Sequence, residues 1–233
     1  MIPRIKKYSK RVFLFKILLL LTITVLLIIN NVSNTLTEED KAVFKTLGYI
    51  KPSKTLSFEE EISLIKEVQF DVFKRAPVGQ GIPENESREP ADLIKAQQGL
   101  CYDRSRTFDK VFQYLGFETR HVYILYKKNK PFHSAIFHYG QQSHAVTEVK
   151  TTKGWMMIDS NTPWVAVTKQ GEPVNADDVW RRFAEFDHAP AYLNEPWWAL
   201  RGVYSRKGQF YGGFLVFPEV NINDFFSWLI LRQ

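Results

Sequence analysis

The stretch GLCYDRSRTFDKVFQYLGFETR, residues 99–120, places the single cysteine of this 233-residue chain at the start of a predicted helix. Its apolar residues recur with the i, i+3, i+4, i+7 spacing of a helix face: Phe108, Val111, Phe112 and Leu115. Gly116 follows at the position where a left-handed residue commonly ends a helix. The pattern therefore predicts a helix over residues 101–115, with the thiol of Cys101 in its first turn.

A cysteine in the first turn of a helix is predisposed to react. The unpaired N–H groups and the dipole at this end favour negative charge, which lowers the thiol pKa, and the thiolate is the form that attacks. Gly99, two residues earlier, lets the chain turn sharply into the helix. Two other interpretations of Cys101 stay open: a buried thiol that packs as a small hydrophobe, and an intermolecular disulfide.

Two short strands joined by a turn near residues 151–153 are predicted downstream, His144–Lys150 and Gly154–Ile158. In such an antiparallel hairpin, His144 and Asp159 lie directly opposite each other or one pairing step apart. Opposed side chains are within about 5.5 Å at Cβ, so the carboxylate can reach the imidazole. A carboxylate in this place fixes the tautomer of a catalytic histidine and stabilises its protonated form. Taken singly, the two residues are equally consistent with an ordinary strand histidine and a turn aspartate.

The remaining elements are predicted from capping, periodicity and turn signals. Ser57 and Glu60 have the spacing of a capping box and open a helix that ends near Ala76. Further helical segments are expected at Glu38–Leu47, Asp92–Gln98 (a turn or short helix) and Asp177–Phe186, and further strands at Thr119–Tyr126, Ser134–Tyr139, Val165–Thr168 and Phe210–Phe217. Helices followed by antiparallel strands indicate an α+β fold, in which the helix that carries Cys101 lies across the sheet.

The N-terminal region combines a basic head with a long apolar run. Six basic residues and no acidic residue lie within positions 4–16, and the run Val12–Ile29 is interrupted only by one lysine and two threonines. Its length is at the short end for a helix that spans a membrane, and the side chain of Lys16 can extend to the interface. The run is therefore interpreted as a membrane anchor.

The positive flank predicts that the N-terminus lies in the cytosol and that residues 31–233 lie outside it. A cleaved signal peptide is the alternative, because Ile17–Ile29 also fits the apolar core of one. The residues that follow, 30–34, offer no good small-residue cleavage site, so an uncleaved anchor is favoured.

Apart from the six N-terminal basic residues, the chain has 25 basic and 25 acidic residues, so the net charge of +6 belongs to the head. A nucleic-acid binder carries its basic excess on the folded domain, so this class is not expected. A hydrophobic share of 45% excludes a disordered chain. With one cysteine, and with His133 and His138 on opposite faces of a predicted strand, neither a metal site nor a cofactor is expected.

These patterns divide the chain into a cytoplasmic basic tail over residues 1–11, a transmembrane anchor over 12–30, a linker over 31–56 and a domain over 57–233. The aromatic stretch at the end of the chain, residues 225–231, is expected to dock on the domain. A position at the membrane interface, where aromatic side chains are favoured, is the alternative.

The stretch Gly99–Arg120 resembles the core of the transglutaminase-like, papain-related superfamily, in the form of a bacterial-type, membrane-anchored member. In that family a Gly-x-Cys opens the helix, and a Leu-Gly-hydrophobic-x-x-Arg motif follows about four turns later, here Leu115–Arg120. The family's second motif is a His, a strand containing Glu, a Gly-Trp turn and an Asp. The matching residues are His144, Glu148, Gly154, Trp155 and Asp159. The resemblance covers about residues 90–165.

The resemblance implies a papain/transglutaminase-like α+β fold in which Cys101 is the nucleophile, His144 the general acid/base and Asp159 the orienting carboxylate. The expected reaction is attack on an amide or peptide bond of a peptide or protein substrate, through a thioester that water or an amine resolves. Tyr102 stands where protein-crosslinking transglutaminases usually have tryptophan, and Val146 where many relatives have tryptophan, which argues against crosslinking specificity.

The developing oxyanion is expected to meet the backbone N–H of Cys101 or the side-chain amide of Gln97 or Gln98. Hydrolysis is favoured over transfer to an amine, because water is always present and the sequence shows no signature for an acyl acceptor. The second class of function consistent with the sequence is a non-catalytic binding or scaffold module that keeps the same fold.

Overall fold

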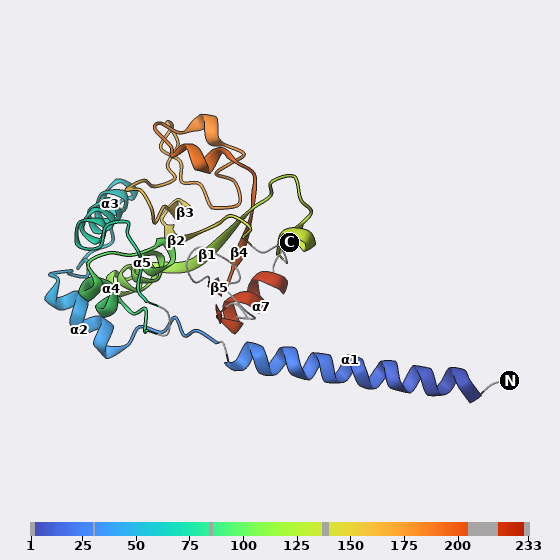
Figure 1. Cartoon of the computed structure of the whole chain (residues 1–233). Coiled ribbons are helices and arrows are strands. Elements are labelled where there is room, and N and C mark those ends of the chain that lie inside the picture. The colour runs from blue at the N-terminus through green and yellow to red at the C-terminus, as the bar shows by residue number, and fades with distance from the viewer. Residues whose placement is uncertain (1–2, 30, 84–85, 137–139, 205–218, 231–233) are drawn as a thin grey trace.

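The structure is a computed structural model that describes residues 3–29, 31–83, 86–136, 140–204 and 219–230 (Figure 1). Its helices are α1 Pro3–Ile29, α2 Glu38–Thr46, α3 Phe58–Arg75, α4 Pro90–Ala96, α5 Cys101–Leu115, α6 Phe132–Ile136 and α7 Ile222–Ile230, with 3-10 turns η1 Phe183–Glu185 and η2 Ala191–Asn194. Its strands are β1 Glu118–Tyr126, β2 Ser143–Thr151, β3 Gly154–Ile158, β4 Trp197–Arg201, β5 Val203–Tyr204 and β6 Glu219–Val220.

An antiparallel sheet in the order β3-β2-β1-β4 forms the centre of the fold (Figure 1). Helix α5 packs across β1 and β2, and α3 packs against α5. The core between them is made of completely buried side chains from both layers, among them Ile65, Phe108, Phe112, Val149 and Met156. The expected α+β class, with the helix of Cys101 on an antiparallel sheet, is confirmed.

Helix α1 is long and apolar enough to span a membrane. The window Lys10–Ile29 contains 20 residues with a mean hydropathy of 3.0, and none of it is buried inside the molecule. Figure 1 shows this helix projecting away from the rest of the chain. A signal sequence has the same properties, so the finding agrees with an anchor by length and composition.

The strand predicted at Ser134–Tyr139 is wrong over residues 134–136, which belong to helix α6; residues 137–139 lie outside the described residues. The backbone N–H groups of Ser134 and Ala135 both donate to the carbonyl oxygen of Pro131, at 3.0 Å, and this turn starts the helix. Strand β1 has no edge left for the segment, because β2 and β4 pair with its two sides.

The helix predicted over residues 177–186 is also wrong, since only η1 is helical there. The side chain of Asn175 accepts a hydrogen bond from the backbone N–H of Asp177 at 2.9 Å, a local turn that competes with helix formation. The Val165–Thr168 segment makes isolated bridges instead of a named strand. The predicted strand over 210–217 lies outside the described residues.

Helix α2 lies in the segment interpreted as a linker, yet it packs on the domain. Phe44 is completely buried in the main core cluster. Asp40 forms an ion pair with Lys110 of α5 at 2.7 Å, with both side chains about 3% exposed. This part of the segment 31–56 therefore folds together with α4 and α5.

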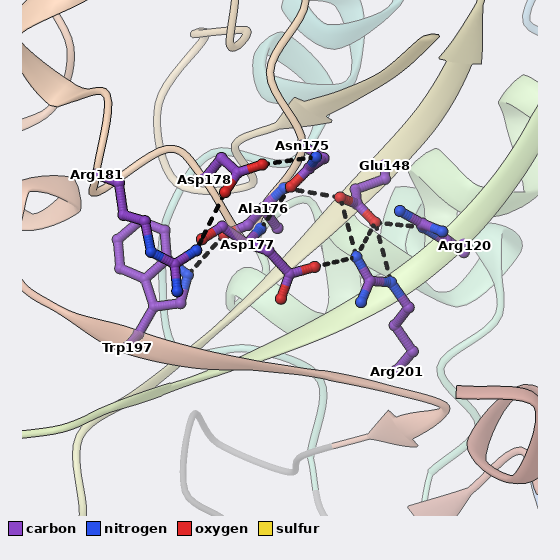
Figure 2. Close-up of polar contacts among 9 residues, drawn as sticks. All are labelled: Arg120, Glu148, Asn175, Ala176, Asp177, Asp178, Arg181, Trp197 and Arg201. Atoms are coloured by element: carbon purple, nitrogen blue, oxygen red, sulfur yellow. Dashed lines mark hydrogen bonds and ion pairs between the residues drawn. The ribbon is translucent and has the colours of Figure 1, made fainter. Parts of the chain in front are cut away.

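A buried carboxylate, Glu148, joins three parts of the sheet (Figure 2). Arg120, its register partner on β1, donates to it, and Arg201 of β4 does so at 3.2 Å. The backbone N–H of Ala176 donates to its other oxygen at 2.7 Å, and Arg201 also pairs with Asp177 at 2.7 Å. Arg120 and Glu148, two residues of the family motifs, thus hold the strands together in this structure.

Replacing Glu148 by alanine should lower the free energy of unfolding by about 3–5 kcal/mol, because two guanidinium groups would lose their buried partner. Denaturant unfolding of the full chain in detergent, followed by tryptophan fluorescence, measures the change. Glu118→Ala is the matched control: its pair with Lys150 is half exposed, so we expect a change of less than about 1 kcal/mol. Equal losses in the two variants would contradict the role given to Glu148.

Candidate functional site

The helix that carries Cys101 begins at a fixed corner. Cys101 is the first residue of α5, and the side chain of Asp103 accepts a hydrogen bond from the backbone N–H of Leu100 at 2.9 Å. Asp103 is completely buried, and it also accepts hydrogen bonds from the backbone of Ile82 and from Arg88, at 3.2 and 2.8 Å. The loop before α4 is thereby fastened to the start of α5, next to the thiol.

Cys101 is 7% exposed, and its thiol lies against His144 and the backbone of Ala145. Burial alone would raise its pKa. The hydrogen bond and positive charge of His144 outweigh burial, with help from the N–H of Ala145 and the charge of Arg104, so the thiol pKa is lowered. The arrangement favours a thiolate beside a protonated imidazole.

His144 and Asp159 meet as the hairpin register requires. Ile158 pairs with Thr147, so Asp159, just beyond β3, falls opposite Val146, two residues from His144 and on the same face of the sheet. The ring nitrogen Nε2 of His144 lies 2.5 Å from the carboxylate oxygen Oδ1 of Asp159. Burial by itself would lower the pKa of His144, but the charge and hydrogen bond of Asp159, with the contact to Cys101, raise it to about 10.

The second oxygen of Asp159 is also held. It accepts hydrogen bonds from the backbone N–H and the hydroxyl of Thr162, at 2.8 and 2.6 Å, and from the hydroxyl of Tyr192. The ring of Tyr192 stands edge-to-face against His144, with centroids 5.6 Å apart. Burial would raise the pKa of Asp159, yet His144 and these donors lower it, which keeps the carboxylate charged. Tyr192 therefore contacts both members of the pair.

Gln69 of α3 fixes the backbone of the loop that carries the aspartate. Its side-chain nitrogen donates to the carbonyl oxygens of Asp159, Thr162 and Trp164, at 2.8, 3.2 and 2.9 Å. The residue is completely buried. This role was not predicted from the sequence, although a glutamine between the apolar residues Val68 and Val72 is a visible signal.

Arg104 connects the cysteine side of the site to the aspartate side. Its Nη1 donates to the carbonyl oxygen of Gly99 and its Nε to that of Ser160, both at 2.5 Å, while Nη2 donates to the side chain of Asn161 at 2.9 Å. The guanidinium is completely buried and lies over the ring of Phe73 at 5.2 Å. One side chain thus holds the two loops that flank Cys101 and Asp159.

The two glutamines proposed for the oxyanion lie at the end of α4. Gln97 is exposed and left-handed, with φ of 53°. The side-chain oxygen of Gln98 accepts a hydrogen bond from the backbone N–H of Gln80 at 3.3 Å. The backbone N–H of Cys101 belongs to the first turn of α5, whose amides have no partner within the helix. All three stay candidates for the oxyanion contact.

Ser105, His121 and Asp109 also lie together, but their arrangement is unsuited to catalysis. The hydroxyl of Ser105 and the carboxylate of Asp109 approach the same nitrogen of His121, Nδ1, at 3.0 and 3.7 Å. A relay needs both ring nitrogens. His121 is completely buried under the stacked ring of Tyr204, and burial lowers its pKa to about 3. We interpret the cluster as core.

The raised pKa of His144 and the lowered pKa of Cys101 predict how stability varies with pH. The pKa of the histidine rises from 6.5 to about 10 on folding, so its contribution is complete below pH 6.5 and is lost as the pH rises through 10. The pKa of the thiol falls from 9.0, so its contribution is present above pH 9 and is lost as the pH falls through the folded value. Between the lowered pKa of the folded thiol and pH 9, the two contributions change with pH in opposite directions.

In the wild type, the melting temperature should therefore fall less steeply between pH 6.5 and 9 than between pH 9 and 10. In Cys101→Ser the opposing slope is gone, while Asp159 still raises the pKa of His144. The melting temperature of this variant should then decline from about pH 6.5 upward. Thermal unfolding of both proteins across this range checks the prediction, and parallel curves would contradict the thiolate–imidazolium pair.

Residues 53–160 match the family model described as the transglutaminase-like superfamily. No curated protein matches the chain. Among solved structures, arylamine N-acetyltransferase C from Bacillus anthracis is similar, with 18% sequence identity and a TM-score of 0.33. The match covers 60% of this chain and 54% of that one, so this chain spans about half the length of the acetyltransferase it matches.

The matched segment begins just before α3 and ends just after Asp159. It contains α3, α5 and strands β1 to β3, together with every residue considered above for the nucleophile, the base, the orienting carboxylate and the oxyanion contact. The resemblance to the transglutaminase-like superfamily that the sequence motifs indicate is thereby confirmed over residues 53–160.

Proposed function

We propose that this protein is a membrane-anchored, extracytoplasmic cysteine enzyme that hydrolyses an amide or peptide bond. The observation that supports the proposal best is the continuous line of contacts from Cys101 through His144 to Asp159, with the pKa of the thiol lowered and that of the imidazole raised. Opposite pKa shifts in two groups that touch are typical of the acid and the base of a catalytic site.

In the proposed reaction the Cys101 thiolate attacks the carbonyl carbon, and the oxyanion forms near the first turn of α5. The imidazolium of His144 gives its proton to the departing amine as the C–N bond breaks, which leaves a thioester. Water then attacks the thioester and loses a proton to His144, and the thiolate leaves with the carboxylic acid as product. Asp159 orients the imidazole and stabilises its charge throughout.

Hydrolysis is the preferred outcome within the acyl-transfer class, because water is the acceptor available at any site open to solvent. A peptide or protein is the proposed substrate. No metal and no organic cofactor takes part in the steps above, since the thiolate and the imidazole supply the nucleophile and the proton.

The proposed location follows from α1 and its basic flank, with the N-terminus in the cytosol and the domain outside it. Protease added to cells whose outer barrier has been breached should digest the chain beyond residue 31. Protection of the whole domain would overturn this orientation.

Reaction of Cys101 with iodoacetamide tests the proposed pair. At neutral pH the thiol in the folded full chain should react faster than a free cysteine, and His144→Ala should slow it by about tenfold or more, because the thiolate fraction falls. His133→Ala, which changes an exposed histidine of α6, is the matched control and should leave the rate unchanged.

Two outcomes would overturn the proposal. If Cys101 is unreactive in the folded protein, the chain is a non-catalytic binding module that keeps the fold. If the thiol reacts equally fast without His144, the pairing of these two residues is wrong.

A further inference from the structure

Helix α7 has apolar side chains on two neighbouring faces, one packed and one exposed. Phe225 and Trp228 pack against the domain, in a cluster with three buried residues of the sheet: Tyr123, Leu125 and Leu200. On the other face Phe226, Leu229 and Ile230 are 44%, 53% and 71% exposed. Their i, i+3, i+4 spacing makes one continuous apolar strip. Docking on the domain, the outcome favoured from the sequence, therefore accounts for only half of this helix.

The start of α7 is hydrogen-bonded to the residues that follow the candidate membrane span. Asn31 pairs with Val220 in a β-bridge, and its side chain accepts from the backbone N–H of Ile222 at 3.0 Å. The backbone N–H of Val32 donates to Val220 at 2.9 Å. The candidate span ends at Ile29, so Asn31 and Val32, which make these contacts, are the second and third residues after it. The start of α7 is therefore close to the end of α1 (Figure 1).

The position of α7 on the domain is also closely set. Gly202, with φ of +71°, lies under its first turn, and a Cβ there would come within 2.3 Å of the backbone nitrogen of Phe225. Asn34 donates to Asp224 at 2.9 Å. The exposed strip therefore has a defined orientation with respect to both the domain and the end of α1.

We infer that the exposed strip of α7, made of Phe226, Leu229 and Ile230, lies in the interface of the bilayer that α1 spans. A nine-residue helix is about 13 Å long, so a helix that starts at the end of the span stays within the interfacial layer if it runs along the surface. The inference rests on the proposed anchor. Residues 219–230 contain no lysine or arginine, so the contact is apolar and needs no anionic lipid.

Lipid contact can be measured because the chain has one cysteine. In a Cys101→Ser background, a single environment-sensitive fluorophore is attached at Leu229→Cys, and the full chain is reconstituted into phosphatidylcholine vesicles. Spin-labelled lipids then quench the fluorophore from a shallow or a deep position in the bilayer. Ile50→Cys, which changes an exposed apolar residue after α2, is the matched control, and Leu20→Cys reports on α1 itself.

A label at position 229 should be quenched about twofold more strongly by the shallow than by the deep lipid, as for a helix at the interface. The label at position 50 should not be quenched, and the label at position 20 should be quenched most by the deep lipid. Quenching at position 20 without quenching at 229 would overturn the inference and leave the anchor intact. Loss of quenching at both positions would overturn the anchor.

The strip could instead be covered by a second copy of this chain. In that case the label at 229 would be shielded from iodide in the aqueous phase but would not be quenched by either lipid, and this result would also overturn the inference. Equal quenching at 229 in vesicles with and without phosphatidylglycerol is expected, because the strip carries no basic side chain.

Discussion

Asp159→Asn should slow turnover of an activated acyl ester by about 10²–10⁴-fold, while the protein stays folded. The carboxylate gives the largest favourable contribution to the raised pKa of His144, through its charge and its hydrogen bond. The amide offers no charge to stabilise the imidazolium, and it can present an N–H to the ring in place of an acceptor. Release of the leaving group, followed with the full chain in detergent, measures the rate.

Two further variants sharpen this measurement. Tyr192→Phe keeps the ring against His144 and removes one donor to Asp159, so we expect a smaller loss than for Asp159→Asn. Asp187→Asn alters a carboxylate that is 68% exposed and should leave the rate unchanged. A wild-type rate in Asp159→Asn would show that this aspartate does not act through the histidine.

Replacing Arg104 by methionine should lower the free energy of unfolding by about 3–5 kcal/mol. The carbonyl oxygens of Gly99 and Ser160 would lose their donor inside the protein, and the two loops of the site would lose their connection. Denaturant unfolding measures the loss. Arg181→Met is the control, because its guanidinium is half exposed and should contribute less than about 1 kcal/mol.

A role in the site itself, beyond stability, has its own readout. The charge of Arg104 helps to lower the pKa of the Cys101 thiol, so Arg104→Met should move the pH profile of alkylation to higher pH. Arg104→Lys keeps the charge and loses the planar fork, so it should lose stability with a smaller shift of that profile. If the methionine variant fails to fold, the lysine variant still tests the connection between the two loops, since unchanged stability would contradict it.

Local signals predicted the elements that carry the candidate triad. Helix spacing and Gly116 placed the ends of α5 at residues 101 and 115, and the Gly-Trp turn placed β3 at 154–158, as observed. The capping box of Ser57 and Glu60 is present, with the serine hydroxyl 3.3 Å from the backbone nitrogen of Glu60. Each of these depends on residues within a few positions of one another, which is why the sequence alone was sufficient.

Contacts between distant segments could not be predicted in the same way. Strand β4 takes the free side of β1 from about 75 residues away, and the sequence before it reads as mixed. Tyr192 reaches Asp159 from η2, and Gln69 reaches the same loop from α3. Phe70 of α3 is apolar but 63% exposed, because α5 and the sheet pack on another side of this helix. Such pairings depend on tertiary packing.

The hydrogen bonds of residues 31–34 hold the domain close to the end of α1. A free linker over residues 31–56 would let the distance between the site and the end of α1 vary by on the order of 30 Å. If α1 is the proposed anchor, the chain fastened directly after it holds the thiol of Cys101 at nearly one height above the bilayer. Under the proposed function, an amide bond would have to be presented at that height, and chains that are themselves attached to the membrane would meet this condition by diffusing in two dimensions.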